Sequence, residues 1–311
     1  MDSFNPFFVK NNTFIQPAYF IISGFIGLPN MKYYYVFLFF VFIISVLANV
    51  AVMAVICLDH NLRAPKYVAV FNLAFVDLLG SCALVPKVLD IFLFNHYYVP
   101  YNDCLAFLFF CYICLSMQAL NLVALCYDRL MAIMFPLHYH VKVTHKIMFS
   151  MLTFFWLFVI TCVLIAIGLL TRLSFCKNVL ACNDNFPNFV ISQLLPFLFL
   201  WMPLIIIFSS YICIGYTLAQ VVAAQERVKA LRTCTAHLSL VVIYFFPILI
   251  TFTMGSGIHP NARIINLSLT SVFPPMLNPI IYVLQTQEIR LSIKRILKGR
   301  NKGLGQRYAS N

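Results

Sequence analysis

Long runs of apolar residues, separated by short polar stretches, dominate the sequence. A helix needs roughly 20 apolar residues to cross the hydrocarbon core of a bilayer. Seven runs are long enough, so we predict seven membrane-spanning helices. They are Tyr33–Leu58, Tyr67–Phe94, Leu105–Tyr127, Ile147–Leu170, Ser192–Val222, Cys234–Met254 and Ala262–Leu284.

A shorter pattern follows the last run. In Gln287–Leu297, Ile289 and Ile293 fall on one helical face, with Arg290 and Lys294 beside them. This pattern predicts a short helix lying on the anionic inner leaflet, so membrane lipid is an expected partner. The predicted fold is therefore all-α: a seven-helix transmembrane bundle followed by a short cytosolic amphipathic helix.

The bundle forms a single predicted domain, because no internal repeat, low-complexity tract or linker divides the chain. We expect residues 1–32 to form an extracellular segment, residues 33–284 the transmembrane domain, and residues 285–311 the cytosolic helix and basic tail.

The composition excludes a soluble globule. The chain is 62% hydrophobic and 10% charged, with a mean hydropathy of +0.91, whereas soluble domains carry about 25% charged residues. Its net charge of +12 does not indicate nucleic-acid binding. The basic residues lie in loops between apolar runs and form no compact basic domain.

The positions of the basic residues predict the orientation in the membrane. With the N-terminus outside, 15 of the 21 Lys and Arg residues fall in inner loops and the tail, so the positive-inside rule places the C-terminus in the cytosol. Asn11 begins a glycosylation triplet, which agrees with an extracellular N-terminus. Asn266 begins a second triplet, but it lies within the seventh predicted span. We expect a multi-pass plasma-membrane protein.

Three of the polar residues inside the predicted spans stand out, because polar groups are costly there. Asn49 lies in the first span, Asp77 in the second and Asn278 in the seventh. They could join helices through polar contacts worth about 1 kcal/mol each, or they could form a water- or sodium-linked switch. Pro279 removes a backbone hydrogen bond and bends the seventh helix, which makes it a candidate two-state element.

Landmarks on the first five helices and the seventh resemble the pattern of rhodopsin-like receptors: Asn49, Asp77, Asp128-Arg129, Trp156, Pro203 and Asn278–Tyr282. A second set resembles odorant receptors specifically. It comprises Pro86–Leu89, Met131–Ile133, Pro136–Tyr139, Ser210-Tyr211, Lys229–Leu238 and Pro274–Pro279. Together they cover the chain from about Asn49 to Arg290.

The resemblance implies a receptor that binds an odorant and activates a stimulatory heterotrimeric G protein, raising cyclic AMP. Activation would swing the sixth helix outward. The implied coupling residues are Asp128, Arg129, Tyr211, Lys229, Arg232, His237, Asn278, Pro279 and Tyr282.

Some positions depart from the family pattern. Leu130 stands where Tyr is usual, and Phe245 stands where Tyr is frequent, with Tyr244 displaced by one. Gln118 replaces a frequent Glu of odorant receptors, which weakens the case for bound sodium. We place Gln118 with Asn49 and Asp77 in a buried polar network.

The cysteines suggest one disulfide and no metal site. Cys104 begins the third span, and both Cys176 and Cys182 follow the fourth, so an outer disulfide is expected on the oxidising side. The resemblance implies Cys182 as the partner of Cys104. No cysteine spacing is typical of a zinc site, and we expect no metal and no cofactor.

By position in this family, the ligand cavity should lie between the third, fifth, sixth and seventh helices. The candidate lining residues are Cys111, Tyr112, Leu115, Ser116, Leu195, Phe199, Ile248, Phe252, Ser268 and Ser271. Such a wall suits a small, mostly apolar molecule oriented by one or two hydrogen bonds. Cys111 stands where amine receptors have Asp, so an amine ligand is disfavoured. Lys87 is expected to pair with Asp90.

Other classes of membrane protein fit less well. A transporter would favour inverted repeats and broken helices, and an enzyme would need a convergent nucleophile, base or metal site. The sequence has none of these patterns, so we expect no enzyme. The alternative is a non-olfactory receptor of the same superfamily.

Overall fold

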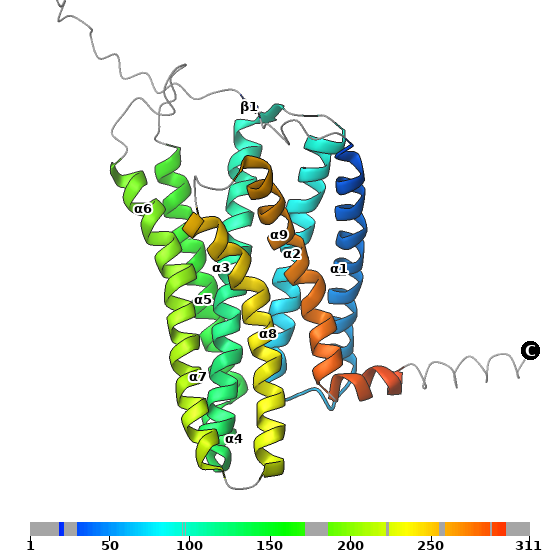
Figure 1. The fold of residues 1–311 in the computed structure, drawn as a ribbon, viewed down its shortest axis with the longest axis vertical. Helices are drawn as coiled ribbons and strands as arrows, with labels where there is room; N and C mark the ends of the chain where they lie inside the picture. Colours follow the sequence, from blue (N-terminus) through cyan, green and yellow to red (C-terminus); the bar gives the residue numbers. More distant parts are fainter. Residues whose placement is uncertain are drawn as a thin grey trace, which may run out of the picture.

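The computed structural model describes residues 19–21, 30–94, 96, 98–171, 186–221, 224–254, 259–286 and 288–296. Seven helices of this part are long and apolar enough to cross a membrane, as the apolar runs predict. Figure 1 shows them running side by side along the long axis of an elongated bundle. We call the end that carries β1 the top and the end that carries residues 288–296 the base.

The helices agree closely with the predicted spans. The first four spans are α1 (Lys32–Leu58), α2 (Lys66–Leu93), α3 (Tyr101–Met134) and α5 (His145–Leu170). The fifth span is built from α6 (Phe186–Pro196), the π-helical turn η2 (Phe197–Trp201) and α7 (Met202–Gln220). The last two are α8 (Ala224–Met254) and α9 (Pro260–Gln285).

The largest differences in length concern α3 and α8, which extend beyond the predicted Leu105–Tyr127 and Cys234–Met254. With 34 residues, α3 is about 50 Å long at 1.5 Å per residue, whereas the hydrocarbon core is about 30 Å thick. An apolar run in the sequence marks only the part of a helix that lies inside lipid. The polar turns beyond that part continue the helix.

Helix α3 is the centre of the bundle, because it packs against α2, α5, α7 and α8. Helix α2 packs against α1, α3 and α9. The approach of α2 to α3 is close at Gly80, where an added Cβ would lie 3.1 Å from the Cβ of Cys114. A larger residue at this position would push the two helices apart.

A short antiparallel strand pair at the top was not predicted. β1 (Tyr19–Ile21) pairs with β2 (Tyr98–Pro100). The rings of Tyr19 and Tyr98 pack edge to face at 5.2 Å, and Phe20 stacks on Tyr101 at 5.8 Å. Strands of three residues are too short to produce a recognisable alternating pattern.

Two short helical turns link α3 to α5 at the base, η1 (Pro136–His138) and α4 (Tyr139–Lys142). Thr144 then caps α5, since its side-chain oxygen accepts a hydrogen bond from the Ile147 amide at 3.3 Å. A Thr at this position stabilises the first turn of a helix.

Residues 288–296 form the predicted amphipathic helix, which turns away from the axis of α9 (Figure 1). Ile289 is buried in the core. Glu288 pairs with Lys66 of α2 at 2.7 Å, and Arg295 pairs with Asp59, beyond the end of α1, at 3.1 Å. The helix is therefore attached to both α1 and α2.

Candidate functional site

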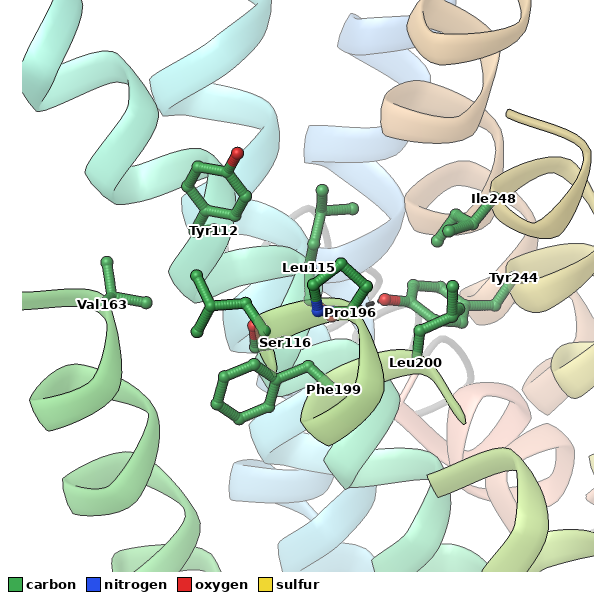
Figure 2. A pocket seen from close by; sticks show the side chains of 10 residues that line it. Tyr112, Leu115, Ser116, Val163, Pro196, Phe199, Leu200, Tyr244 and Ile248 are labelled. Carbon is green, nitrogen blue, oxygen red and sulfur yellow. Dashed lines mark hydrogen bonds between the residues drawn. The ribbon is translucent and has the colours of Figure 1, made fainter. Parts of the chain in front are cut away.

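A cavity lies between α3, α5, the fifth span and α8, with about 510 Å³ of empty space that includes its open mouth. It is lined by Tyr112, Leu115, Ser116, Val163, Leu195, Pro196, Phe199, Leu200, Tyr244 and Ile248. Figure 2 shows that these side chains come from separate helices and surround one space. The wall is almost entirely apolar and carries no charged residue.

Three hydroxyl groups are the polar side chains of this wall. The Tyr244 hydroxyl donates to the Leu115 carbonyl at 2.5 Å (Figure 2), so its proton is already used. Tyr112 and Ser116 lie one turn apart on the same face of α3, and their hydroxyls make no hydrogen bond with the described residues. Both groups can therefore bond to a molecule in the cavity.

The π-helical turn η2 brings the fifth span against the cavity. The Met202 amide donates to the Phe197 carbonyl five residues earlier, which widens the helix by one residue per turn. Phe199 and Leu200 are consequently buried, whereas Phe197 and Trp201 are exposed. A regular α-helical pattern does not predict this register, and Pro196 at the preceding position is the only local signal.

The structure brings six of the predicted ligand residues together around the cavity: Tyr112, Leu115, Ser116, Leu195, Phe199 and Ile248. It adds Val163, Pro196, Leu200 and Tyr244, which the sequence analysis did not include. The side chain of Phe252 lies outside what the structure describes.

Cys111, Ser268 and Ser271 do not line this cavity. Ser268 faces α1, where its hydroxyl is 2.5 Å from the Tyr34 hydroxyl, and it donates to its own helix at Ile265. Ser271 donates to the Leu267 carbonyl of its own helix. Position in the sequence does not define which face of α9 the two serines occupy, because the rotation of a helix is not visible in an apolar run. Cys111 adjoins Tyr112 on α3 but points to a different side of that helix.

Asp77 is fully buried, and both of its carboxylate oxygens accept an amide hydrogen bond. Gln118 of α3 donates to Oδ1 at 2.7 Å, and Asn278 of α9 donates to Oδ2 at 2.8 Å. The amide groups thus join three helices at one carboxylate. The sequence placed all three residues inside spans, but it did not indicate this pairing.

Asn49 replaces a hydrogen bond that a proline removes. Pro279 has no amide hydrogen, so the Pro275 carbonyl one turn earlier has no partner in α9. The Asn49 side chain donates to that carbonyl at 2.8 Å and to the Ser45 carbonyl at 2.9 Å. Unpaired backbone groups are expensive inside a membrane, so Asn49 makes the bend in α9 tolerable.

At the base, Asp128 lies between an arginine and a tyrosine. The Tyr139 hydroxyl donates to Oδ1 at 2.6 Å, whereas the Arg129 guanidinium is 3.6 Å from Oδ2. Proximity to Asp128 contributes, after burial, to raising the pKa of the Tyr139 phenol, so it stays protonated and donates. Arg129 forms this ion pair with Asp128 but makes no hydrogen bond with the described residues, so its N–H groups are available to a partner at the base.

His237 joins α8 to α3 and α7. Its Nε2 lies 2.9 Å from the Leu122 carbonyl, and its Nδ1 lies 2.9 Å from the Tyr211 hydroxyl. A carbonyl only accepts, so Nε2 must carry the hydrogen. His237 is 3% exposed, which makes it an internal connection between helices.

A second cavity, with about 420 Å³ of empty space that includes its open mouth, lies beside this connection. Its lining includes Arg129, His237 and Tyr282, together with Leu125 and Leu240. The Tyr282 hydroxyl is buried and has no hydrogen-bond partner among the residues that the structure describes. Of the other predicted coupling residues, Arg232 is exposed on α8, and the side chain of Lys229 is outside what the structure describes.

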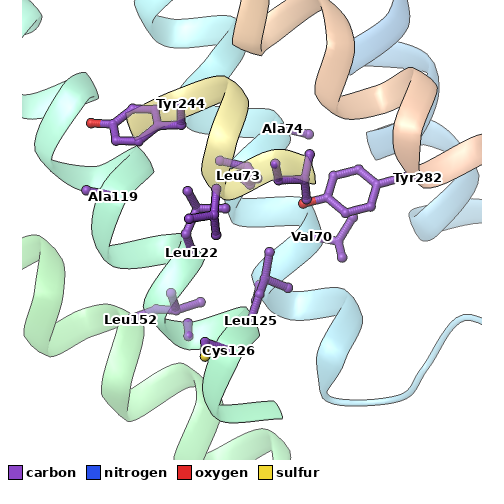
Figure 3. Packing of buried hydrophobic residues seen from close by; sticks show 14 of the residues in the cluster. Val70, Leu73, Ala74, Ala119, Leu122, Leu125, Cys126, Leu152, Tyr244 and Tyr282 are labelled. Atoms are coloured by element: carbon purple, nitrogen blue, oxygen red, sulfur yellow. The ribbon is translucent and has the colours of Figure 1, made fainter. Parts of the chain in front are cut away.

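One apolar cluster connects the two cavities. It contains Tyr244 and Ile248 of the first cavity and Leu125 and Tyr282 of the second, with Leu122 between them. Figure 3 shows Tyr244 of α8, Leu122 and Leu125 of α3 and Tyr282 of α9 beside side chains of α2. Protein interiors are close-packed, and this cluster continues from the wall of one cavity to the wall of the other.

Two predicted features cannot be placed. Asn11, Cys176 and Cys182 lie outside the described residues. Cys104 is on the first turn of α3 at the top, as an outer disulfide requires. The disulfide and the glycosylation therefore stay predictions. In the described part of the chain, no three His, Cys, Asp or Glu side chains are arranged to hold a metal ion.

Comparison with known proteins identifies the family. The profile of the 7 transmembrane receptor (rhodopsin family) matches residues 48–282. The chain is 31% identical to Olfactory receptor 1 of Rattus norvegicus and 30% identical to Olfactory receptor 1E16 of Mus musculus. In both cases the match covers 89% of this chain and 95% of the relative. The chain belongs to the olfactory receptors of the rhodopsin family.

The fold of this olfactory receptor family member agrees with that of a solved receptor. Squid rhodopsin superimposes with a TM-score of 0.72 over 92% of each chain, at 18% identity. Because members of this family are receptors, the prediction that the chain is no enzyme is confirmed. A small-molecule ligand and a G protein are the partners that the family implies.

Proposed function

We propose that this receptor binds a small, uncharged, mostly apolar odorant in the cavity lined by Tyr112 and Ser116. The observation that carries the proposal is the wall itself: ten residues without a charge, two of which present unpaired hydroxyls. An apolar wall with a few polar groups is typical of small-ligand sites. A buried ammonium or carboxylate would find no counter-ion there.

The proposed output is nucleotide exchange on a stimulatory heterotrimeric G protein, with a rise in cyclic AMP. Support comes from the base, where Arg129 is positioned beside a cavity between α3 and α8. Outward movement of α8 would enlarge this space for a partner protein. Lys229 and Arg232 on the same helix would contribute to the contact.

The proposed orientation places the top outside the cell and the base in the cytosol of a plasma-membrane receptor. Basic residues gather at the base, where Arg63, Lys66, Lys294 and Arg295 lie in or beside helix ends. The Asn11 triplet belongs to the opposite end of the chain. Residues 1–32 would then be extracellular, residues 285–311 cytosolic, and the Cys104–Cys182 disulfide extracellular.

A cyclic-AMP reporter in cells that express the receptor, challenged with an odorant panel, tests the ligand and the output. We expect a response that Arg129→Ala abolishes at equal surface expression. For the active odorant, Ser116→Ala should raise the half-maximal concentration by about tenfold, the cost of one hydrogen bond.

Ser209→Ala is the matched control, because the Ser209 hydroxyl is exposed on α7 and bonds only to its own helix at Ile205. An equal effect of both Ser variants would reject the cavity as the binding site. A cyclic-AMP response that survives Arg129→Ala would reject the coupling mechanism.

The orientation has an independent test. Glycosidase treatment should shift the mobility of the receptor, and Asn11→Gln should remove the shift. An antibody to a C-terminal tag should bind only permeabilised cells. Tag staining of intact cells would reverse the proposed orientation.

A further inference from the structure

Asn266 of α9 makes a contact that the predicted switch residues do not include. Its side-chain amide donates to the Pro247 carbonyl of α8 at 2.7 Å and to the Thr251 hydroxyl oxygen at 2.7 Å. The Thr251 hydroxyl in turn donates to the Pro247 carbonyl at 3.2 Å. The three groups therefore form a closed set of hydrogen bonds between the two helices.

This contact lies at Pro247, inside α8, where a proline is expected to bend the helix. Pro247 has no amide hydrogen, and its ring clashes with the carbonyl one turn earlier, so the two halves of a proline-containing helix can turn against each other. The residues on either side of Pro247 face the ligand cavity, since Tyr244 and Ile248 both line it. A ligand that pushes on this wall therefore pushes on the bend.

The distance of a contact from Pro247 determines whether that contact can persist when the base end of α8 moves outward. Displacement is smallest at a hinge and grows with distance from it. His237 lies ten residues before Pro247, about 15 Å along the helix, so its bond to the Leu122 carbonyl must break when the base end moves. The Asn266 contact lies at the hinge itself and can persist.

We propose that Asn266 is a positioning residue that fixes the pivot of α8 against α9. With the pivot held, pressure from a ligand at Tyr244 and Ile248 turns the base half of α8. Without it, the same pressure shifts the upper half of α8 away from α9. The inference rests on the proposed function, because it assumes that the ligand occupies the cavity. It also gives the Asn266 triplet a role inside the bundle, away from glycosylation enzymes.

The test measures basal signal, maximal odorant response and half-maximal concentration at matched surface expression. Asn266→Ala should lower the maximal response about fivefold, as expected for the loss of two interhelical hydrogen bonds in a membrane, without raising the basal signal. The half-maximal concentration should change less than twofold, because Asn266 does not line the cavity.

Three further variants separate a pivot from general damage. Thr251→Val preserves the side-chain shape and removes one acceptor, so it should lower the maximal response less than Asn266→Ala does. The double variant should be no weaker than Asn266→Ala alone, since both act on one contact. Asn266→Gln keeps the amide, so its maximal response should fall by no more than half as much as that of Asn266→Ala. Ser239→Ala on α8 is the control, because the Ser239 hydroxyl bonds only within its own helix.

The outcomes are distinct. A raised basal signal in Asn266→Ala would show that the contact restrains the resting receptor and would overturn the pivot. An unchanged maximal response would also overturn it. If wild-type receptor shows no response to any odorant, the proposed function fails first. If Asn266→Ala does not reach the surface, the maximal response of Thr251→Val is the test. A lowered response supports the pivot, and an unchanged one overturns it.

Discussion

Several polar side chains inside the bundle are paired between helices, and each such pair fixes a relative position of the helices that it joins. Asp77 joins α2 to α3 and α9, and His237 joins α8 to α3 and α7. In lipid, apolar burial hardly favours one helix contact over another. The polar pairs therefore select the arrangement, although each contributes only about 0.6 kcal/mol on average.

Replacing His237 should activate the receptor without ligand. His237→Phe keeps a ring of similar size but removes the bonds to the Leu122 carbonyl and the Tyr211 hydroxyl. Because these bonds hold α8 inward, we expect the basal cyclic-AMP signal to rise about three- to tenfold, the range for one or two membrane hydrogen bonds. Tyr211→Phe removes only one of them and should raise the signal less. A basal signal at the wild-type level in His237→Phe would contradict this role.

Gln118 should make the receptor insensitive to sodium. Both oxygens of Asp77 already accept amide hydrogen bonds, from Gln118 and Asn278, so no oxygen is left without a donor. We expect the same odorant potency when extracellular and cytosolic sodium is exchanged for potassium. Gln118→Glu places a second carboxylate against Asp77 and should create a cation requirement, because two adjacent buried carboxylates repel. Sodium-dependent potency in the wild type would contradict this pairing.

The sequence indicated which buried polar residues are important, but it did not indicate which of them bond to one another. Asn49, Asp77, Gln118 and Asn278 stand out because polar residues in an apolar run are rare and costly. Which of them share a bond depends on the rotation of each helix, which an apolar run does not define. For the same reason Ser268 was placed in the cavity although it faces Tyr34 of α1.

At the scale of elements, the apolar runs located all seven spans but not their irregularities. The π-helical turn of Phe197–Trp201 shifts the register of the fifth span, and this shift brings Leu200 into the cavity wall. Val163 was missed because α5 is apolar on every side. A helix that is apolar all round gives no indication of which face meets its neighbours.

The helix of residues 288–296 depends on two acidic anchors, Asp59 and Glu288. Hydrogen bonds from Ser292 and Asn61, assisted by the charge of Arg295, lower the pKa of Asp59 from 3.8 to about 2. A carboxyl with a lowered pKa stabilises the folded arrangement above its ordinary pKa, and this contribution is lost only as the pH falls towards 2. The Asp59 anchor should therefore be complete at any physiological pH.

Hydrogen exchange of the amides of residues 288–296 measures this anchor. After correction for the intrinsic rate, we expect equal protection at pH 5 and pH 8, and reduced protection at both pH values in Asp59→Ala. Lys294→Ala is the control, because Lys294 is exposed and outside the two ion pairs. Protection that falls between pH 8 and pH 5 in the wild type would show that another titrating group holds the helix.

At the scale of the whole molecule, the apolar cluster of Tyr244, Leu122 and Tyr282 extends from one cavity to the other, and we expect it to couple them. Coupling between two binding sites is reciprocal. If odorant in the upper cavity favours G-protein binding at the base, then nucleotide-free G protein must raise odorant affinity by the same factor. Typical coupling energies of about 1–3 kcal/mol correspond to roughly 5- to 150-fold.

Odorant binding to the receptor in lipid nanodiscs, with and without purified G protein, tests this reciprocity. We expect G protein to tighten odorant binding at least about fivefold, at the lower end of that range, and GTP to reverse the change. Arg129→Ala should abolish the tightening and leave the affinity without G protein unaltered, because Arg129 is absent from the upper cavity. Leu122→Ala should weaken the tightening, since it opens a void between the cavities while both sites remain. Equal odorant affinity with and without G protein would mean that the two ends of the bundle move independently, whatever each of them binds.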